Sequence, residues 1–185
     1  MAASARDLHR EKSAGTLERQ LLGPASRGDL MLGKWVAATA QGMVMLLVLY
    51  LAGGVAFRVN LGPDPLSLPL LVLFCCAAAA AFFLFLAQLT RTEKLMDNIS
   101  TIVVLVSGLI GGNMIPVDQM PQFFHVVGRI GFNYWANVGF SDIMVRNRSL
   151  LESPQPFLIL LAMTVGYTLL NLMLARLRPH RGVWS

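Results

Sequence analysis

Charged side chains are scarce in this sequence of 185 residues, where Asp, Glu, Lys and Arg together contribute 14%. Soluble domains average about 25% of these residues. Four long stretches contain no Asp, Glu, Lys, Arg or His at all. A soluble core of this size does not require such gaps, so the distribution of charge predicts an integral membrane protein rather than a soluble domain.

Cysteine is also rare, and its two copies, Cys75 and Cys76, are neighbours inside an apolar stretch. Adjacent cysteines are badly placed for a disulfide bond and lack the spacing of metal ligands, so we interpret them as small apolar helix residues. The four apolar stretches also lack the acids and bases of a proton or ion relay. We therefore expect no metal site, no directly bound cofactor and no catalytic site in this chain.

What the sequence has instead is long apolar runs. A membrane-spanning helix needs about 20 mostly apolar residues, because the hydrocarbon core of a bilayer is about 30 Å thick. Four runs meet this requirement: residues 36–57, 66–89, 98–117 and 156–175. They predict an all-α integral membrane protein with about four transmembrane helices. This transmembrane domain, residues 35–176, lies between an N-terminal segment of residues 1–34 and a tail of residues 177–185.

Capping residues precede three of these runs. Asp64 and Ser153 each stand directly before a proline, which places a capping side chain ahead of a first-turn proline. Asp97 or Asn98 can cap the run at 98–117 in the same way. We therefore expect helices to begin at these positions.

The basic residues indicate the orientation of the spans. Lys and Arg number 15 and sit beside the apolar runs, which fits membrane orientation better than a nucleic-acid-binding face. With loops on alternate sides, eleven of them fall on the side of both termini and four on the other. Cytoplasmic loops carry the excess of Lys and Arg. Both termini are therefore predicted to be cytoplasmic, with residues 58–65 and 118–155 external.

The N-terminal segment contains a short amphipathic helix over residues 16–22, with three leucines on one face and a Gly-Pro pair at its end. A second helix starts at Ser26 and leads into the first apolar run. The amphipathic helix fits two roles. It lies on lipid head groups, or it docks into a groove on a cytoplasmic partner, and the residues alone leave both roles open.

Residues 28–34 match the first seven positions of a phosphate-binding loop, G-x-x-x-x-G-K. The next residue is Trp35, where such a loop needs Ser or Thr to reach magnesium. No strand is expected before the match, and an apolar run follows it. We therefore expect no nucleotide site in this segment.

Two groups of residues carry a resemblance to a known family. The first group comprises Arg10-Glu11-Lys12, Gly15-Thr16-Leu17-Glu18-Arg19, Pro24, Ser26-Arg27 and Gly33-Lys34. The second comprises residues 107–116 (SGLIGGNMIP), Met120-Pro121 and Asn133-Tyr134-Trp135-Ala136. In order and spacing they resemble the type-two family of ABC exporter permeases, and the resemblance covers nearly the whole chain.

The resemblance implies a multi-pass permease subunit of the inner cell membrane that exports a hydrophobic or amphipathic substrate. ATP would be hydrolysed by a separate ABC ATP-binding subunit, and a second permease subunit, identical or different, would complete the assembly. The first group would be a coupling helix that docks on the ATP-binding subunit. Its residues would be Gly15, Thr16, Leu17, Glu18, Arg19, Leu21, Leu22 and Pro24.

The chain departs from the family pattern in two respects. Family permeases usually have six spans, two of them before the coupling motif, whereas this sequence begins at that motif. The sequence therefore resembles the C-terminal portion of such a permease, and we expect either a fragment or truncated gene product or a chain whose two missing spans come from another chain. The alternative is a truncated remnant, or a small membrane scaffold or accessory protein without transport activity. Phe132 also stands where the family often has proline before Asn-Tyr-Trp.

The end of the third run is rich in glycine. Gly108 and Gly112 form a G-x-x-x-G spacing with Gly111 beside it, and small residues at this spacing let helices approach closely. The spacing fits packing within the chain, a seam between permease subunits or a substrate path, and Asn113 and Pro116 belong to the same run. The small residues at 77–81 allow the same interpretations.

The region after the third run is neither a clean span nor a soluble loop. Residues 121–130 and 134–145 each predict a short amphipathic helix, and aromatic residues favour the membrane interface. We interpret the external region at 118–150, with Pro121, Tyr134 and Trp135, as short helices that dip into the outer leaflet. The re-entrant helices implied by the resemblance agree with this, and they would close the exit of the pathway.

Overall fold

The computed structural model describes residues 27–58, 60, 62–90, 92–113 and 122–177. Within these ranges the chain forms helices joined by turns, and no strand is present. The predicted all-α membrane class is therefore confirmed.

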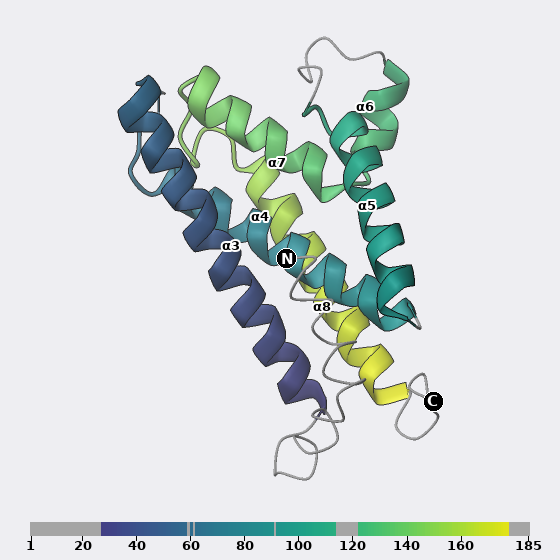
Figure 1. Ribbon diagram of the computed structural model, residues 1–185. Helices are drawn as coiled ribbons and strands as arrows, with labels where there is room; N and C mark the ends of the chain where they lie inside the picture. Colours follow the sequence, from purple (N-terminus) through teal and green to yellow (C-terminus); the bar gives the residue numbers. More distant parts are fainter. Residues whose placement is uncertain (1–26, 59, 61, 91, 114–121, 178–185) are drawn as a thin grey trace.

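Four long helices run alternately in opposite directions (Figure 1). They are α3 (Arg27–Phe57), α4 (Ser67–Leu89), α5 (Glu93–Ile110) and α8 (Gln155–Leu177). The start of α3 and the end of α8 lie at the same end of the bundle, here called the proximal end. The opposite end, the distal end, carries α6 (Gln122–Gly128), α7 (Phe132–Phe140) and the π-helix η2 (Ser141–Val145). These short helices match the two predicted for residues 121–130 and 134–145.

Three of the four predicted spans are helices long and apolar enough to cross a membrane: Gly28–Phe57, Ser67–Leu89 and Gln155–Ala175. The first is longer than predicted, because α3 continues without a break from Arg27. The match to a phosphate-binding loop at 28–34 thus lies inside a helix and not in a loop.

The bounds predicted for the third span, 98–117, are wrong. The helix α5 begins at Glu93, because the Thr92 side chain accepts a hydrogen bond from the Leu95 amide at 3.2 Å and caps it. Neither Asp97 nor Asn98 is the cap. The helix ends at Ile110, since Gly112 has a φ of +93°, which glycine adopts readily and which closes a helix.

The other two predicted caps form different contacts. Leu66 precedes α4 without a side-chain cap, and the Asp64 carboxylate accepts a hydrogen bond from the Ser67 hydroxyl at 3.4 Å. The Ser153 hydroxyl donates to the Asp142 carboxylate at 2.7 Å. The Ser153 side chain, which the local sequence predicted as the cap of α8, therefore binds Asp142, a residue eleven positions earlier in the sequence.

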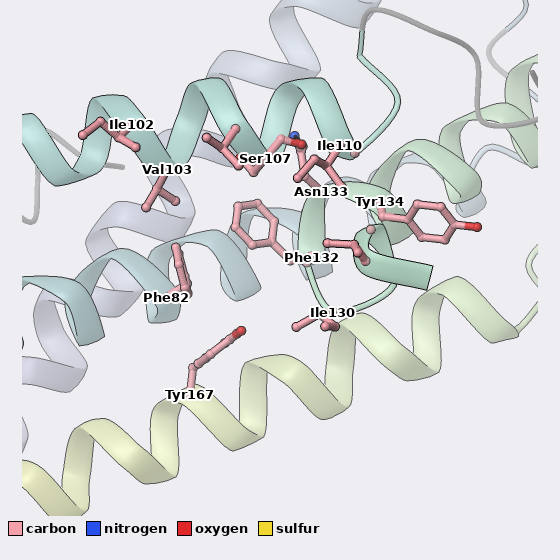
Figure 2. Close-up of a pocket in the computed structure, with 15 residues that line it drawn as sticks. Phe82, Ile102, Val103, Ser107, Ile110, Ile130, Phe132, Asn133, Tyr134 and Tyr167 are labelled. Atoms are coloured by element: carbon pink, nitrogen blue, oxygen red, sulfur yellow. Dashed lines mark hydrogen bonds between the residues drawn. The ribbon is translucent and has the colours of Figure 1, made fainter. Parts of the chain in front are cut away.

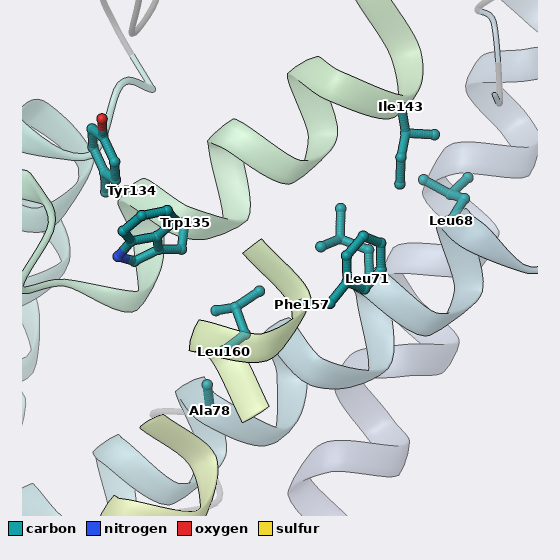
Figure 3. Close-up of a cluster of buried hydrophobic side chains, with 8 residues drawn as sticks. All are labelled: Leu68, Leu71, Ala78, Tyr134, Trp135, Ile143, Phe157 and Leu160. Atoms are coloured by element: carbon teal, nitrogen blue, oxygen red, sulfur yellow. The ribbon is translucent and has the colours of Figure 1, made fainter. Parts of the chain in front are cut away.

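The core lies around α4, which packs between α3 and α8 (Figures 1 and 3). Leu71 and Ala78 of α4 are fully buried, as is Leu160 of α8. The predicted small-residue face at Ala77–Ala81 is buried inside the chain, where small side chains let the neighbouring helices approach. The resulting proximity allows the Trp35 indole of α3 to donate a hydrogen bond to the Ala77 carbonyl at 3.0 Å.

A buried amide pair joins α4 to α8 within the same core. The Gln88 side chain donates to the Asn171 side-chain oxygen. The Asn171 amide in turn donates to the Ala81 carbonyl at 2.9 Å and to the Tyr167 carbonyl at 2.8 Å. Polar groups inside a membrane need partners within the protein, and here α4 and α8 supply them to each other.

Candidate functional site

The predicted coupling helix lies outside the described residues. This applies to Gly15, Thr16, Leu17, Glu18, Arg19, Leu21, Leu22 and Pro24, and also to Pro116 and Pro121. Their roles stay predictions. The structure does show where the N-terminal segment joins the bundle, because α3 begins at Arg27 at the proximal end.

At the distal end, the end of α5 is held by asparagine side chains, here called the distal amide cluster (Asn113, Asn133 and Asn137). The Asn133 amide donates to the Ser107 carbonyl at 3.1 Å, and the Asn137 amide donates to the Gly111 carbonyl at 2.7 Å. Asn137 also donates to the Asn113 side-chain oxygen. The last carbonyls of a helix have no partner within it. The Ser107 carbonyl also accepts from the Gly111 amide at 2.7 Å, so Asn133 adds a second donor there. Two side chains of α7 thus bind the end of α5 and fix the two helices together.

Gly111 makes this contact possible. A Cβ atom at this position would lie 3.0 Å from the Asn133 Cβ and 2.4 Å from the Ser107 carbonyl oxygen, so a larger residue would separate α5 from α7. Gly108 has more room, since its nearest neighbour would be the Asn113 amide at 3.4 Å. The G-x-x-x-G interpretation needs correction, because Gly112 lies beyond the end of α5 and does not share a helical face with Gly108.

The aromatic pair predicted in short helices that dip into the outer leaflet is buried within the chain. Tyr134 and Trp135 are 5% and 8% exposed, and their rings meet edge to face with centroids 5.4 Å apart. The Trp135 indole donates to the Arg129 carbonyl at 2.9 Å. These rings anchor the turn between α6 and α7 to the core, a role that a preference for the membrane interface does not predict.

A buried carboxylate holds the connection from η2 to α8. Asp142 is 5% exposed, and its two oxygens accept hydrogen bonds from Arg146 and from Ser153, both at 2.7 Å. With both oxygens occupied by structural partners, Asp142 stabilises the loop. The described residues contain no group of three His, Cys, Asp or Glu that could hold a metal ion.

An apolar pocket of about 390 Å³ lies between α5 and α8 (Figure 2). The α5 wall is formed by Ile102, Val103, Val106, Ser107, Ile110 and Gly111. The rest is formed by Phe82 of α4, by Tyr167 of α8 and by Val127, Gly128 and residues 130–134. The pocket thus collects Ser107, Gly111 and Tyr134 from the family-like motifs, although the motifs themselves did not indicate a cavity.

Sequence reasoning missed two features of this region. Asn137 was not recognised, although it lies four residues after Asn133 in a short apolar helix, and this spacing places both amides on one face. Phe82 carried no signal, because phenylalanine in an apolar span is ordinary. Only the position of α5 relative to α4 turns it into a pocket residue.

The described residues form a helix bundle with one apolar pocket beside α5, which suits an apolar ligand. In a comparison with protein families, residues 1–173 match the family described as "ABC-2 family transporter protein". No curated protein and no solved structure matches significantly. A match over nearly all of the sequence is decisive for the family, whose membrane subunits are typically not catalytic. The chain therefore belongs to the ABC-2 transporter family, as a permease subunit in a membrane.

Proposed function

We propose that this permease subunit couples ATP hydrolysis by a separate ATP-binding subunit to the export of a hydrophobic or amphipathic substrate. The observation that carries the proposal is the family match over residues 1–173, which includes the whole segment with the coupling-type residues. That segment leads directly into α3, so a partner bound there would act on a helix that reaches the distal end.

The apolar character of the bundle supports the substrate class. Apart from residues near their proximal ends, α3, α4 and α8 contain no charged side chain, and the pocket beside α5 has no charged residue in its lining. A charged or strongly polar substrate would leave its hydration shell without gaining a partner there. An apolar or amphipathic substrate would lose little.

Residue 27 and residue 177 lie at the same end of the bundle, and the turn after α4 lies there as well. Along the sequence, residues 1–34, 90–97 and 176–185 flank the helix ends that lie there, and they contain eleven of the 15 Lys and Arg residues. We therefore propose that the proximal end faces the cytoplasm. Reporter fusions check the orientation. Green fluorescent protein should fluoresce at either terminus, and alkaline phosphatase inserted after Leu151 should be active. The opposite pattern would reverse the assignment.

Recovery of the chain from its native membrane in mild detergent tests the coupling, with co-purifying proteins identified by mass spectrometry. An ABC ATP-binding subunit should accompany the wild-type chain and should be lost when Leu21 and Leu22 are both changed to Asp. The matched control changes Val145 and Leu151 to Asp, since both are exposed at the distal end, and this variant should keep the partner.

Two outcomes contradict the proposal in different ways. A well-inserted wild-type chain without any ATP-binding subunit would favour a remnant or scaffold without transport activity. A partner that persists in the variant with both leucines changed would exclude residues 16–22 as the coupling helix.

A Glu18→Lys variant separates the two roles of this helix. Loss of the partner indicates docking, whereas a helix lying on lipid head groups tolerates the change.

A further inference from the structure

The pocket between α5 and α8 has an aromatic wall and an aliphatic wall. The Phe82 ring lies 5.3 Å from the Tyr167 ring and 5.7 Å from the Phe132 ring, measured between centroids. Val103 and Ile102 of α5 lie on the other side of the space (Figure 2). The volume of about 390 Å³ is large enough for a small molecule or a hydrocarbon chain. It is far too small for a further helix.

The polar groups at its rim are directed to the protein itself. The Ser107 hydroxyl donates to the Val104 carbonyl at 3.2 Å, and the Asn133 amide donates to the Ser107 carbonyl. The Tyr167 hydroxyl is the exception, because no residue of the described chain accepts a hydrogen bond from it. An occupant therefore meets an apolar surface with a single hydroxyl at its edge.

The depth of the pocket along α8 and the side on which it opens indicate that lipid tails surround it. Tyr167 lies about 18 Å along α8 from the distal end of that helix, at a rise of 1.5 Å per residue. The hydrocarbon core is about 30 Å thick, so the pocket lies at the depth of lipid tails. Ile102 and Ile130 both line it and are largely exposed, which means that the pocket opens at the side of the bundle.

We propose that this pocket is a binding site for one acyl chain of a bilayer phospholipid. An empty space between α5 and α8 would deprive the lining side chains of dispersion contacts, and a lipid tail restores them. Lipid tails surround the opening at high concentration, and a ligand needs no polar group to bind the apolar lining. The site requires neither ATP nor a partner subunit, so its test is independent of the proposed export function.

Photo-crosslinking of the full chain in phosphatidylcholine nanodiscs tests the site. The probe is a phosphatidylcholine with a diazirine on one acyl chain, and mass spectrometry maps the labelled residues. Labelling at Val103 and Tyr167 should saturate as the probe fraction rises and should fall when unlabelled phosphatidylcholine replaces it. Labelling at Leu105, on the exposed face of α5, should rise in proportion. Proportional labelling at both places would overturn the proposal without any variant.

Two variants with a matched control sharpen the test. Val103→Trp fills the pocket and should lower labelling of Tyr167 by roughly tenfold, since a misfit of one or two methylene groups already changes binding in an apolar pocket by about that factor. Leu105→Trp adds the same side chain to the exposed face of the same helix and should leave that labelling unchanged. Equal labelling in the two variants would contradict the proposal.

Tyr167→Phe asks which kind of ligand is bound. A hydrocarbon tail accepts no hydrogen bond from the Tyr167 hydroxyl, so saturable labelling of Val103 should persist in this variant. A loss of roughly tenfold would show instead a ligand that accepts a hydrogen bond from Tyr167, and the acyl-chain assignment would then be wrong.

Discussion

The helices α4 and α5 are neighbours in the sequence but are held in opposite ways. Most of α4 is buried between α3 and α8, with alanines that bring the helices close and a buried amide pair near its proximal end. Only Met96 and Ser100 of α5 are buried, and the helix is fixed mainly at its two ends, by Thr92 and by the distal amide cluster. Both helices contain one of the four uncharged runs of the sequence, yet α4 belongs to the core and α5 borders a pocket.

This contrast shows that apolar composition does not measure packing in a membrane protein. Lipid tails are as apolar as leucine, so helices associate through close packing and polar contacts and not through hydrophobicity itself. The small side chains and amides of α4 and α8 supply both. The branched residues along α5 supply neither, and this helix is therefore free to border a space that another molecule fills.

The largest expected effect comes from truncating one leucine in each region. Leu160→Ala should lower the free energy of unfolding by about 3 kcal/mol, because it opens a cavity among fully packed side chains. Leu105→Ala, at a residue that is 67% exposed, should cost less than about 0.5 kcal/mol. SDS titration in mixed micelles measures both. Equal losses would abolish the distinction between the two regions.

The buried amide pair provides the next test. Asn171→Leu should cost about 2 kcal/mol, since it removes the acceptor of the Gln88 hydrogen bond and the donor to the Ala81 and Tyr167 carbonyls. Replacing both Gln88 and Asn171 by leucine should cost less than the two single changes together, because each single change already loses the hydrogen bond that the two side chains share. The same titration decides, and strict additivity would show that the two side chains are not coupled.

The glycines at the end of α5 test how closely that helix is held. Gly111→Ala should cost about 1 kcal/mol, because the added Cβ crowds Asn133 and the Ser107 carbonyl. Gly108→Ala should be neutral or slightly stabilising, since alanine favours a helix and meets ordinary contact distances there. A reversed order of the two would show that the helix face with Gly108 is more closely packed than the contact at Gly111.

The smallest effect is expected for the distal amide cluster. Asn137→Ala removes the hydrogen bonds to the Gly111 carbonyl and to the Asn113 side chain, and such contacts in membranes are worth about 0.6 kcal/mol each on average. Hydrogen exchange should quicken in the last turn of α5 and stay unchanged in α4. Faster exchange in both helices would mean that the end of α5 supports the whole bundle.

The sequence predicted those features that depend on periodicity and charge. Apolar runs, with proline and glycine at their ends, predicted the all-α class, three of the apolar spans and the two short distal helices. The bounds of α5 were not predicted. The helix begins after its cap Thr92 and includes three charged residues, which lie outside the uncharged run from which the span was predicted. The contacts of Ser153 and Asp142 join residues across a turn that no local pattern specifies.

The site was predictable only in part for the same reason. The family-like motif gave the region around Gly111 and Tyr134, but the pocket is formed by the distance between α5 and α8. That distance depends on contacts between helices, such as the hydrogen bond from Asn133 to the end of α5 and the ring contact between Phe82 and Tyr167. It is a tertiary property, and the linear sequence contains no periodic signal for it.

The unbroken length of α3 has a mechanical consequence. Its 31 residues form a stiff rod of about 46 Å, which exceeds the hydrocarbon thickness of about 30 Å. The Trp35 indole rests on α4 about 12 Å from one tip, and the Tyr50 ring rests on Phe140 of α7 about 22 Å further along. The rod thus joins the proximal end, where Arg27 lies, to a contact with α7 at the distal end. A displacement of the whole rod at Arg27 would change its contacts with α4 and with α7 together.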